Sequence, residues 1–204
     1  MDLEQRHIDA LDQAETLLFH SDFCPYLELK EMLTVSTPQA QSRFRSLFTS
    51  YYGLNVGGLT APFKDRYFEI LFSGDVLTNG EPRFAEILTE LCAIPSATGR
   101  HAMPFSFVSK LVAIYLESSP IYDRYVRALF SGEAPGTDVD QQQRIAWYVG
   151  FLEQVSDSYE AWAQDVRVIP IIDRLKARDE KLALCHVNRL LDFLVWKVGN
   201  QELL

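Results

Sequence analysis

Apolar side chains recur at helical spacing along nearly the whole chain, and this spacing limits the fold more than any other feature. The first stripe runs from Leu3 to Leu18 and the last from Leu184 to Val195, each with the three- and four-residue steps of one helix face. Two β-branched runs, 76–78 and 166–169, are short and have no evident partner strand. The sequence therefore predicts an all-α protein.

Capping residues, prolines and glycines mark where the helices begin and end. Thr37-Pro38 and Thr60-Ala-Pro62 each place a capping hydroxyl before a proline in the first turn. Gly53 stands where glycine commonly ends a helix, and Pro170 interrupts the helical pattern. We expect eight to nine helices, including the ranges 37–52, 60–72, 82–94, 105–117, 122–130, 140 to beyond 162, and 181–198.

Length and composition are those of an ordinary globular chain. The 204 residues are 48% hydrophobic and 23% charged, which is enough apolar surface to form a core. We expect a single all-helical domain over 1–204, with a division into an N-terminal part, 1–95, and a C-terminal part, 96–204, as the alternative.

The sequence predicts a cytoplasmic protein without a membrane span, a metal or a cofactor. No stretch approaches the roughly 20 apolar residues of a transmembrane helix, and the first residues are acidic and polar rather than signal-like. Cys24, Cys92 and Cys185 are far apart in the sequence, as expected of reduced thiols rather than of a disulfide framework or a zinc site. The four histidines are also isolated from one another.

The net charge of −9 argues against unspecific, charge-driven binding to nucleic acid, because lysine and arginine provide most of that affinity. Small basic clusters occur at Arg43 and Arg45, at 64–66, and at Arg124 and Arg127. These clusters form either one local basic face or scattered, solvated charge.

Lys110 lies on the expected helix 105–117, which is apolar on almost every side. Such a lysine extends to the surface, pairs with a carboxylate, or acts as a nucleophile. The helix climbs about 10 Å from Lys110 to Glu117, and the next six residues span up to roughly 20 Å. Asp123 can therefore return beside Lys110, although its simplest role is to cap the following helix.

The surrounding motifs resemble those of helix-hairpin-helix DNA glycosylases, and more closely a bacterial group with the 8-oxoguanine DNA glycosylase fold. In that group Ser-Phe-x-[Ser/Thr]-Lys precedes Pro-Ile-Tyr-Asp-x-x-Val, as Ser106-Phe-Val-Ser-Lys110 precedes Pro120-Ile-Tyr-Asp-Arg-Tyr-Val126 here. The segments 51–60 and 66–70 are also similar, and Leu191-Asp-Phe-Leu-Val-Trp196 is weakly so. Together these segments cover most of the chain.

The resemblance implies a DNA glycosylase, with or without lyase activity, that excises a damaged or modified base. Lys110 would be the Schiff-base nucleophile and Asp123 the catalytic carboxylate. The target nucleotide has to leave the duplex and enter a pocket lined by aromatic and hydrogen-bonding groups. Candidates for base or DNA contacts are His101, Phe105, Ser106, Arg124 and Trp147.

One segment departs from the usual hairpin of these enzymes. Where they carry a glycine-rich turn whose amides bind a DNA phosphate, Ala102-Met-Pro-Phe-Ser-Phe107 has no glycine. A phosphate would instead meet the amides of this helix start, with Ser106 assisting. Two alternatives to the enzyme stay open: a non-catalytic module for protein interaction or regulation on the same scaffold, and a plain helical domain in which Lys110 and Asp123 form an ion pair.

Overall fold

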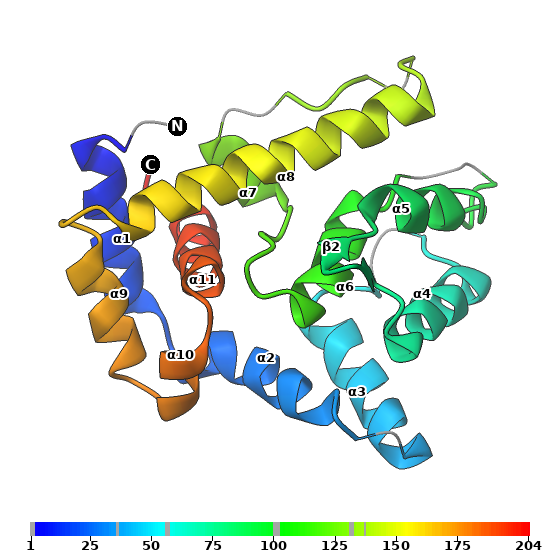
Figure 1. The fold of residues 1–204 in the computed structure, drawn as a ribbon, viewed down its shortest axis with the longest axis horizontal. Coiled ribbons are helices and arrows are strands. Elements are labelled where there is room, and N and C mark those ends of the chain that lie inside the picture. Colours follow the sequence, from blue (N-terminus) through cyan, green and yellow to red (C-terminus); the bar gives the residue numbers. More distant parts are fainter. Residues whose placement is uncertain (1–2, 36, 56–57, 100–102, 131–132, 137) are drawn as a thin grey trace. The chain divides into compact units, whose positions relative to one another are not determined.

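The computed structural model describes residues 3–35, 37–55, 58–99, 103–130, 133–136 and 138–204 (Figure 1). It is mostly helical, with 67% of residues in helices and one small hairpin. In order along these described residues the elements are α1 (Gln5–Leu17), α2 (His20–Met32), α3 (Pro38–Tyr51), α4 (Ala61–Ser73), β1 (Leu77–Thr78), β2 (Glu81–Pro82), α5 (Phe84–Cys92), α6 (Phe105–Tyr115), α7 (Arg124–Leu129), α8 (Gln141–Ala163), α9 (Ile169–Lys176), α10 (Glu180–Leu184) and α11 (Val187–Asn200).

The capping signals in the sequence are confirmed where they were clearest. The Thr37 hydroxyl accepts a hydrogen bond from the Ala40 N–H at 3.2 Å, and the Thr60 hydroxyl accepts one from the Phe63 N–H at 3.4 Å. Gly53 follows the end of α3 with a φ of 71°, in the left-handed region that only glycine enters without strain. These local signals therefore set the bounds of α3 and the start of α4.

The helices are more numerous than expected because the last third of the chain is divided more finely. Pro170 does not break a helix but stands in the first turn of α9, where its missing N–H is harmless. The expected helix 181–198 is two helices, α10 and α11, because the His186 side chain accepts a hydrogen bond from the Asn188 N–H at 3.2 Å and starts a new helix. Helix α2 was not among the expected ranges.

The expectation that 76–78 forms no strand is wrong in detail. Leu77 pairs with Pro82 and Thr78 with Glu81 in an antiparallel hairpin. Asn79 and Gly80, with φ values of 53° and 88°, form its turn, and Asn-Gly is the dipeptide that favours such two-residue connections. Each strand is only two residues long, which is too short for an alternating pattern.

The chain divides into two compact units. Unit 1 consists of Met1–Phe23 and Glu117–Leu204, and unit 2 of Cys24–Leu116. The division falls inside α2, between Phe23 and Cys24. The next residue, Pro25, has no backbone N–H, so the helix lacks one hydrogen-bond donor there.

Helix α11 is the centre of unit 1, where it packs against α1, α7, α8 and α9 (Figure 1). Its Leu190, Leu191 and Leu194 are fully buried. Gly199 lets α7 approach closely, because a Cβ atom at this position would overlap the Tyr125 side chain. The path of α7, which begins after Asp123, therefore depends on α11.

Unit 2 has an aromatic core between α3 and α4, and α5 packs on both α4 and α6. Phe48 contacts the rings of Tyr67 and Phe68, with centroids 5.9 Å apart in each case. The Tyr67 hydroxyl donates to the Phe107 carbonyl at 2.8 Å, which joins α4 to α6. This core fixes the orientation of α6, the helix that carries Lys110.

Within the residues that the structure describes, no helix combines the length and apolar character needed to cross a bilayer.

Candidate functional site

Lys110 is half-buried on α6 and its amine lies against aromatic rings of unit 2. The Nζ atom is 5.7 Å from the ring centroid of Tyr52 and 5.5 Å from that of Phe107. It also donates a hydrogen bond of 3.4 Å to the Tyr52 carbonyl. Because α6 is packed in the core on its other faces, the amine is held at the end of α3 rather than extended into solvent.

Asp123 is the N-cap of α7 in unit 1. Its Oδ1 atom accepts hydrogen bonds from the Tyr125 and Val126 N–H groups, both at 2.8 Å. The capping role considered from the sequence is thereby confirmed. These two backbone donors at a helix N-terminus fix the position of the carboxylate.

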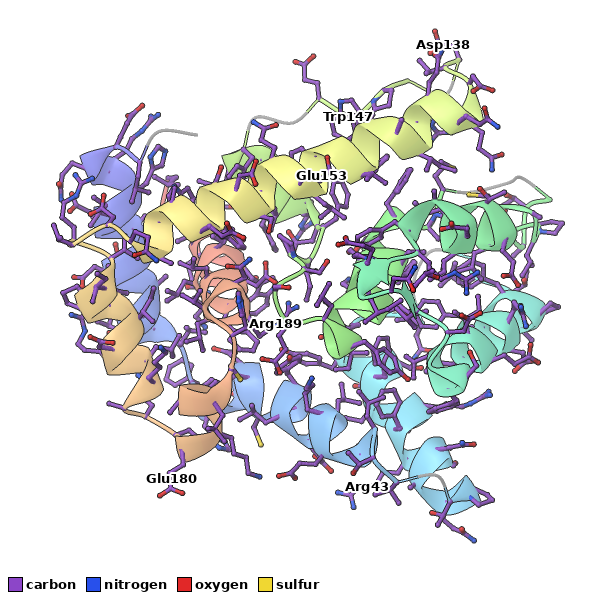
Figure 2. The ribbon with its side chains drawn as sticks, viewed as in Figure 1. Arg43, Asp138, Trp147, Glu153, Glu180 and Arg189 are labelled. Atoms are coloured by element: carbon purple, nitrogen blue, oxygen red, sulfur yellow. The ribbon has the colours of Figure 1, made fainter. Side chains whose placement is uncertain are left out.

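The segment that leads to Asp123, residues 117–123, is held by the first turns of α11. The Asn188 side chain donates to the Ser118 carbonyl at 2.7 Å, and Arg189, labelled in Figure 2, donates to the Ser119 carbonyl at 3.0 Å. The Ile121 N–H donates to the Asp192 carboxylate at 3.1 Å. We call Asn188, Arg189 and Asp192 the α11 clamp. It satisfies backbone groups of a connection that is otherwise without regular structure.

The α11 clamp contains a buried ion pair. Arg189 is fully buried, Asp192 is 5% exposed, and the two side chains contact each other directly. Burial raises the pKa of Asp192 to about 7, while the Arg189 guanidinium, the Ile121 N–H and the Tyr159 hydroxyl act in the opposite direction. Desolvation therefore outweighs the attraction of the partner, as is common for buried pairs.

Asp123 is electrostatically linked to this cluster. Burial raises the pKa of Tyr159 well above its ordinary value, and the carboxylates of Asp192 and Asp123 both raise it further. Asp123 also raises the pKa of Asp192. The anion at the start of α7 thus lies within electrostatic range of the clamp that holds its connection.

The other residues expected to contact a base or DNA have varied surroundings. Phe105 is only 5% exposed in the core of unit 2, and Ser106 is half-buried in the first turn of α6. Arg124 is exposed, with its guanidinium 4.6 Å from the Tyr125 ring centroid. Trp147 is half-buried on α8 (Figure 2). His101 lies outside the described residues.

The candidate residues therefore form two groups, one in each unit. Helix α6 of unit 2 carries Lys110, Phe105 and Ser106. In unit 1, Asp123 and Arg124 stand at the start of α7, and Trp147 lies on α8.

Sequence reasoning missed the α11 clamp, although the sequence carried a signal for it. Asn188, Asp192 and Val195 are spaced by four and three residues, which places two polar side chains on one face with an apolar one. Buried polar side chains of this kind need partners. The sequence alone does not show which segment supplies those partners.

Across the ranges that the structure describes, no three His, Cys, Asp or Glu side chains lie close enough together to hold a metal ion. What the described residues provide is an amine against aromatic rings and an anchored carboxylate, the two groups that nucleophilic and electrostatic catalysis employ.

Comparison of the chain with protein-family models, with curated proteins and with solved structures gives no match.

Proposed function

We propose that the protein is a DNA glycosylase with lyase activity, on a helix-hairpin-helix glycosylase-like scaffold, in which Lys110 is the nucleophile and Asp123 the catalytic carboxylate. The observation that carries the proposal is the environment of the Lys110 amine, which is held by the Tyr52 carbonyl and by the rings of Tyr52 and Phe107.

Holding the amine is useful because lysine is a flexible side chain. Fixing a nucleophile in one geometry before the substrate arrives removes much of the entropic part of the barrier. The aromatic rings around the amine also offer flat apolar surface of the kind on which an extruded base or sugar packs. A half-buried lysine at the end of an aromatic core therefore suits attack on a nucleotide better than an exposed lysine would.

Asp123 has the complementary role of stabilising positive charge on the sugar. As the bond between C1′ and the base breaks, its electron pair leaves with the base and the sugar becomes cationic. An anion that is already fixed by two N–H donors stabilises that charge without reorganising. The Lys110 nitrogen then bonds to C1′ and loses a proton, and opening of the sugar ring gives the Schiff base.

The first experiment is borohydride trapping of wild type and Lys110→Ala on single-stranded and duplex oligonucleotides that contain 8-oxoguanine, uracil or an abasic site. We expect a covalent adduct with wild type and none with Lys110→Ala. The matched control is Lys64→Ala, another half-buried lysine of unit 2, whose amine donates to Asn55 at 3.3 Å. Equal trapping by wild type and Lys110→Ala, or no adduct on any substrate, would contradict the proposal.

Two substitutions in the same assay separate the proposed catalytic role of Asp123 from its role as a helix cap. Asn also caps helices well, whereas Ala does not. Asp123→Asn should therefore fold like wild type and lose base excision, while Asp123→Ala should also lose about 1 kcal/mol of stability. Full excision activity in Asp123→Asn would leave this carboxylate with the capping role alone.

A non-catalytic interaction module is the second candidate, and one observation favours it. Large apolar side chains of unit 1 are strongly exposed, with Phe19 at 65%, Val166 at 79% and Leu184 at 86%. Scattered apolar residues are common on surfaces, so their exposure is a weaker argument than the surroundings of Lys110. Absence of both trapping and DNA binding at low salt would favour this candidate.

A further inference from the structure

Three arginines differ from all the others that the structure describes. Every other arginine in the described ranges forms an ion pair with an aspartate or glutamate. Arg124, Arg127 and Arg144 have no such partner among the described residues, although the chain carries a net charge of −9. All three belong to α7 and to the first turn of α8, within unit 1.

Arg127 and Arg144 both lie within electrostatic range of Tyr148. Burial raises the pKa of Tyr148, whereas the guanidiniums of Arg144 and Arg127 each lower it, so both positive charges act on the same oxygen. Arg144 and Tyr148 are four residues apart on α8 and so share a helix face. The Tyr122 ring lies against Tyr148, with centroids 4.8 Å apart and hydroxyls 3.5 Å apart.

One donor in this cluster lacks a partner. The Arg144 Nε atom is buried and has no hydrogen-bond partner among the described residues. A buried donor left unsatisfied destabilises the folded state. An acceptor that binds here recovers that free energy, so the arrangement favours an oxygen-rich ligand.

The carboxylates that begin the two helices are directed at backbone groups. Asp123 accepts from the N–H groups at the start of α7. Asp140 accepts from the Gln142 and Gln143 N–H groups at the start of α8, at 2.9 and 3.3 Å. Both carboxylates therefore serve as helix caps.

We propose that Arg127, Arg144 and Tyr148 form a phosphate-binding site that takes the sugar–phosphate backbone of a nucleic acid. Two guanidiniums and a phenol are the kinds of donor that phosphate oxygens accept from. Trp147 stacks on Phe151 with ring centroids 5.3 Å apart beside this site, and an aromatic side chain next to a phosphate contact is typical of nucleic-acid binding. The choice of nucleic acid over other phosphates rests on the proposed function.

The test is fluorescence anisotropy with a labelled single-stranded oligothymidine and a labelled duplex, titrated at several salt concentrations. Arg127→Ala and Arg144→Ala should each weaken binding by about 10- to 150-fold, since each removes a hydrogen bond to a charged group. Each should also reduce the slope of log K against log salt by about one. Arg144→Lys keeps the charge without the guanidinium fork, so its affinity should be intermediate.

The matched control is Arg167→Ala, an exposed arginine of unit 1 that pairs with Asp165 at 2.6 Å. It should bind as wild type does. Circular dichroism and thermal melting show whether each variant is folded. If Arg144→Ala does not fold, Arg144→Lys still tests the site. Unchanged affinity and salt slope in Arg127→Ala together with unchanged affinity in Arg144→Lys, or no binding by wild type at low salt, would overturn the site.

The two experiments distinguish a wrong phosphate-binding site from a wrong enzymatic function. Trapping that depends on Lys110, together with arginine variants that bind normally, would retain the enzyme and remove the site. Binding that depends on Arg127 and Arg144 without any adduct would retain the site and remove the Schiff-base chemistry. Anionic lipid vesicles and inorganic phosphate serve as competitors for the labelled DNA. If vesicles displace the DNA at a lower concentration of phosphate groups than unlabelled oligonucleotide does, the choice of nucleic acid is overturned.

Discussion

At the scale of single residues, Asp192 has a structural role and also a pKa near neutral pH. Its carboxylate accepts the Ile121 N–H and pairs with Arg189 in a buried site. Burial nevertheless raises its pKa to about 7, from an ordinary value of 3.8. The folded protein therefore binds this proton more tightly than the unfolded chain does.

This difference predicts how stability depends on pH. Between about pH 4 and pH 7 the folded state holds more protons at Asp192 than the unfolded state, so the contribution of this group to the free energy of unfolding falls as pH rises. Asp192→Asn does not titrate. The stability of wild type relative to Asp192→Asn should therefore decrease from about pH 4 to about pH 7 and then level off.

Urea unfolding of both proteins at several pH values in this window measures that difference. A gain of wild-type stability relative to Asp192→Asn with rising pH would mean that Arg189 lowers the pKa of Asp192 more than burial raises it. Asp9→Asn, at an exposed position of α1, controls for the general effect of removing one carboxylate.

For the candidate residues, the sequence predicted the local features but not the distant contacts. The apolar faces of the helix around Lys110 and the capping position of Asp123 follow from local patterns, and the structure has both. The partners of Lys110 at Tyr52, and of residues 117–123 at α11, are more than fifty residues away in the chain. Such contacts depend on tertiary packing, which no local pattern encodes.

At the scale of elements, the closest packing described is that of α7 on α11. Gly199 faces Tyr125, whose hydroxyl also donates to Asn200 at 3.4 Å. Gly199→Ala places a methyl group where the Tyr125 side chain already lies. The helix must then move or the tyrosine must change its rotamer, so we expect a loss of about 1–3 kcal/mol of stability.

Gly150→Ala is the matched control, because a Cβ atom there meets nothing within 4 Å. It lies inside α8, where alanine is favoured over glycine by about 1 kcal/mol. Denaturant unfolding should show Gly199→Ala less stable and Gly150→Ala more stable than wild type. Equal stabilities of the two variants would contradict the close packing of α7 on α11.

Elements with strong terminal signals were predicted well, and those with weak signals were not. Thr37 and Thr60 begin helices as expected, because a cap depends only on its neighbours in sequence. Separation of α10 from α11 depends on a histidine acting as a cap, which is uncommon. The β1–β2 hairpin was missed since its strands of two residues are shorter than any periodicity.

At the scale of the whole molecule, the two units differ in how the chain builds them. Unit 2 is one continuous segment, whereas unit 1 joins Met1–Phe23 to Glu117–Leu204. A continuous unit with its own aromatic core is expected to fold independently. Residues 24–116 expressed alone should therefore give a helical circular dichroism spectrum and a cooperative urea transition.

Pro25 makes this fragment a favourable one. Within α2 it lacks the N–H that would continue the helix, but near a new N-terminus that donor is not needed. A fragment without helical signal, or one that melts without cooperativity, would show that unit 2 requires unit 1 in order to fold.

The divided make-up of unit 1 has a consequence for the order of events during biosynthesis. Helix α1 leaves the ribosome before the rest of its unit, and its partner α11 is made only after the whole of unit 2 and most of unit 1. At a synthesis rate of about 5–20 residues per second, α1 waits roughly 9–35 seconds for that partner. During this interval α11 does not yet cover the apolar face of α1, and a nascent-chain chaperone has both a target and the time to bind it.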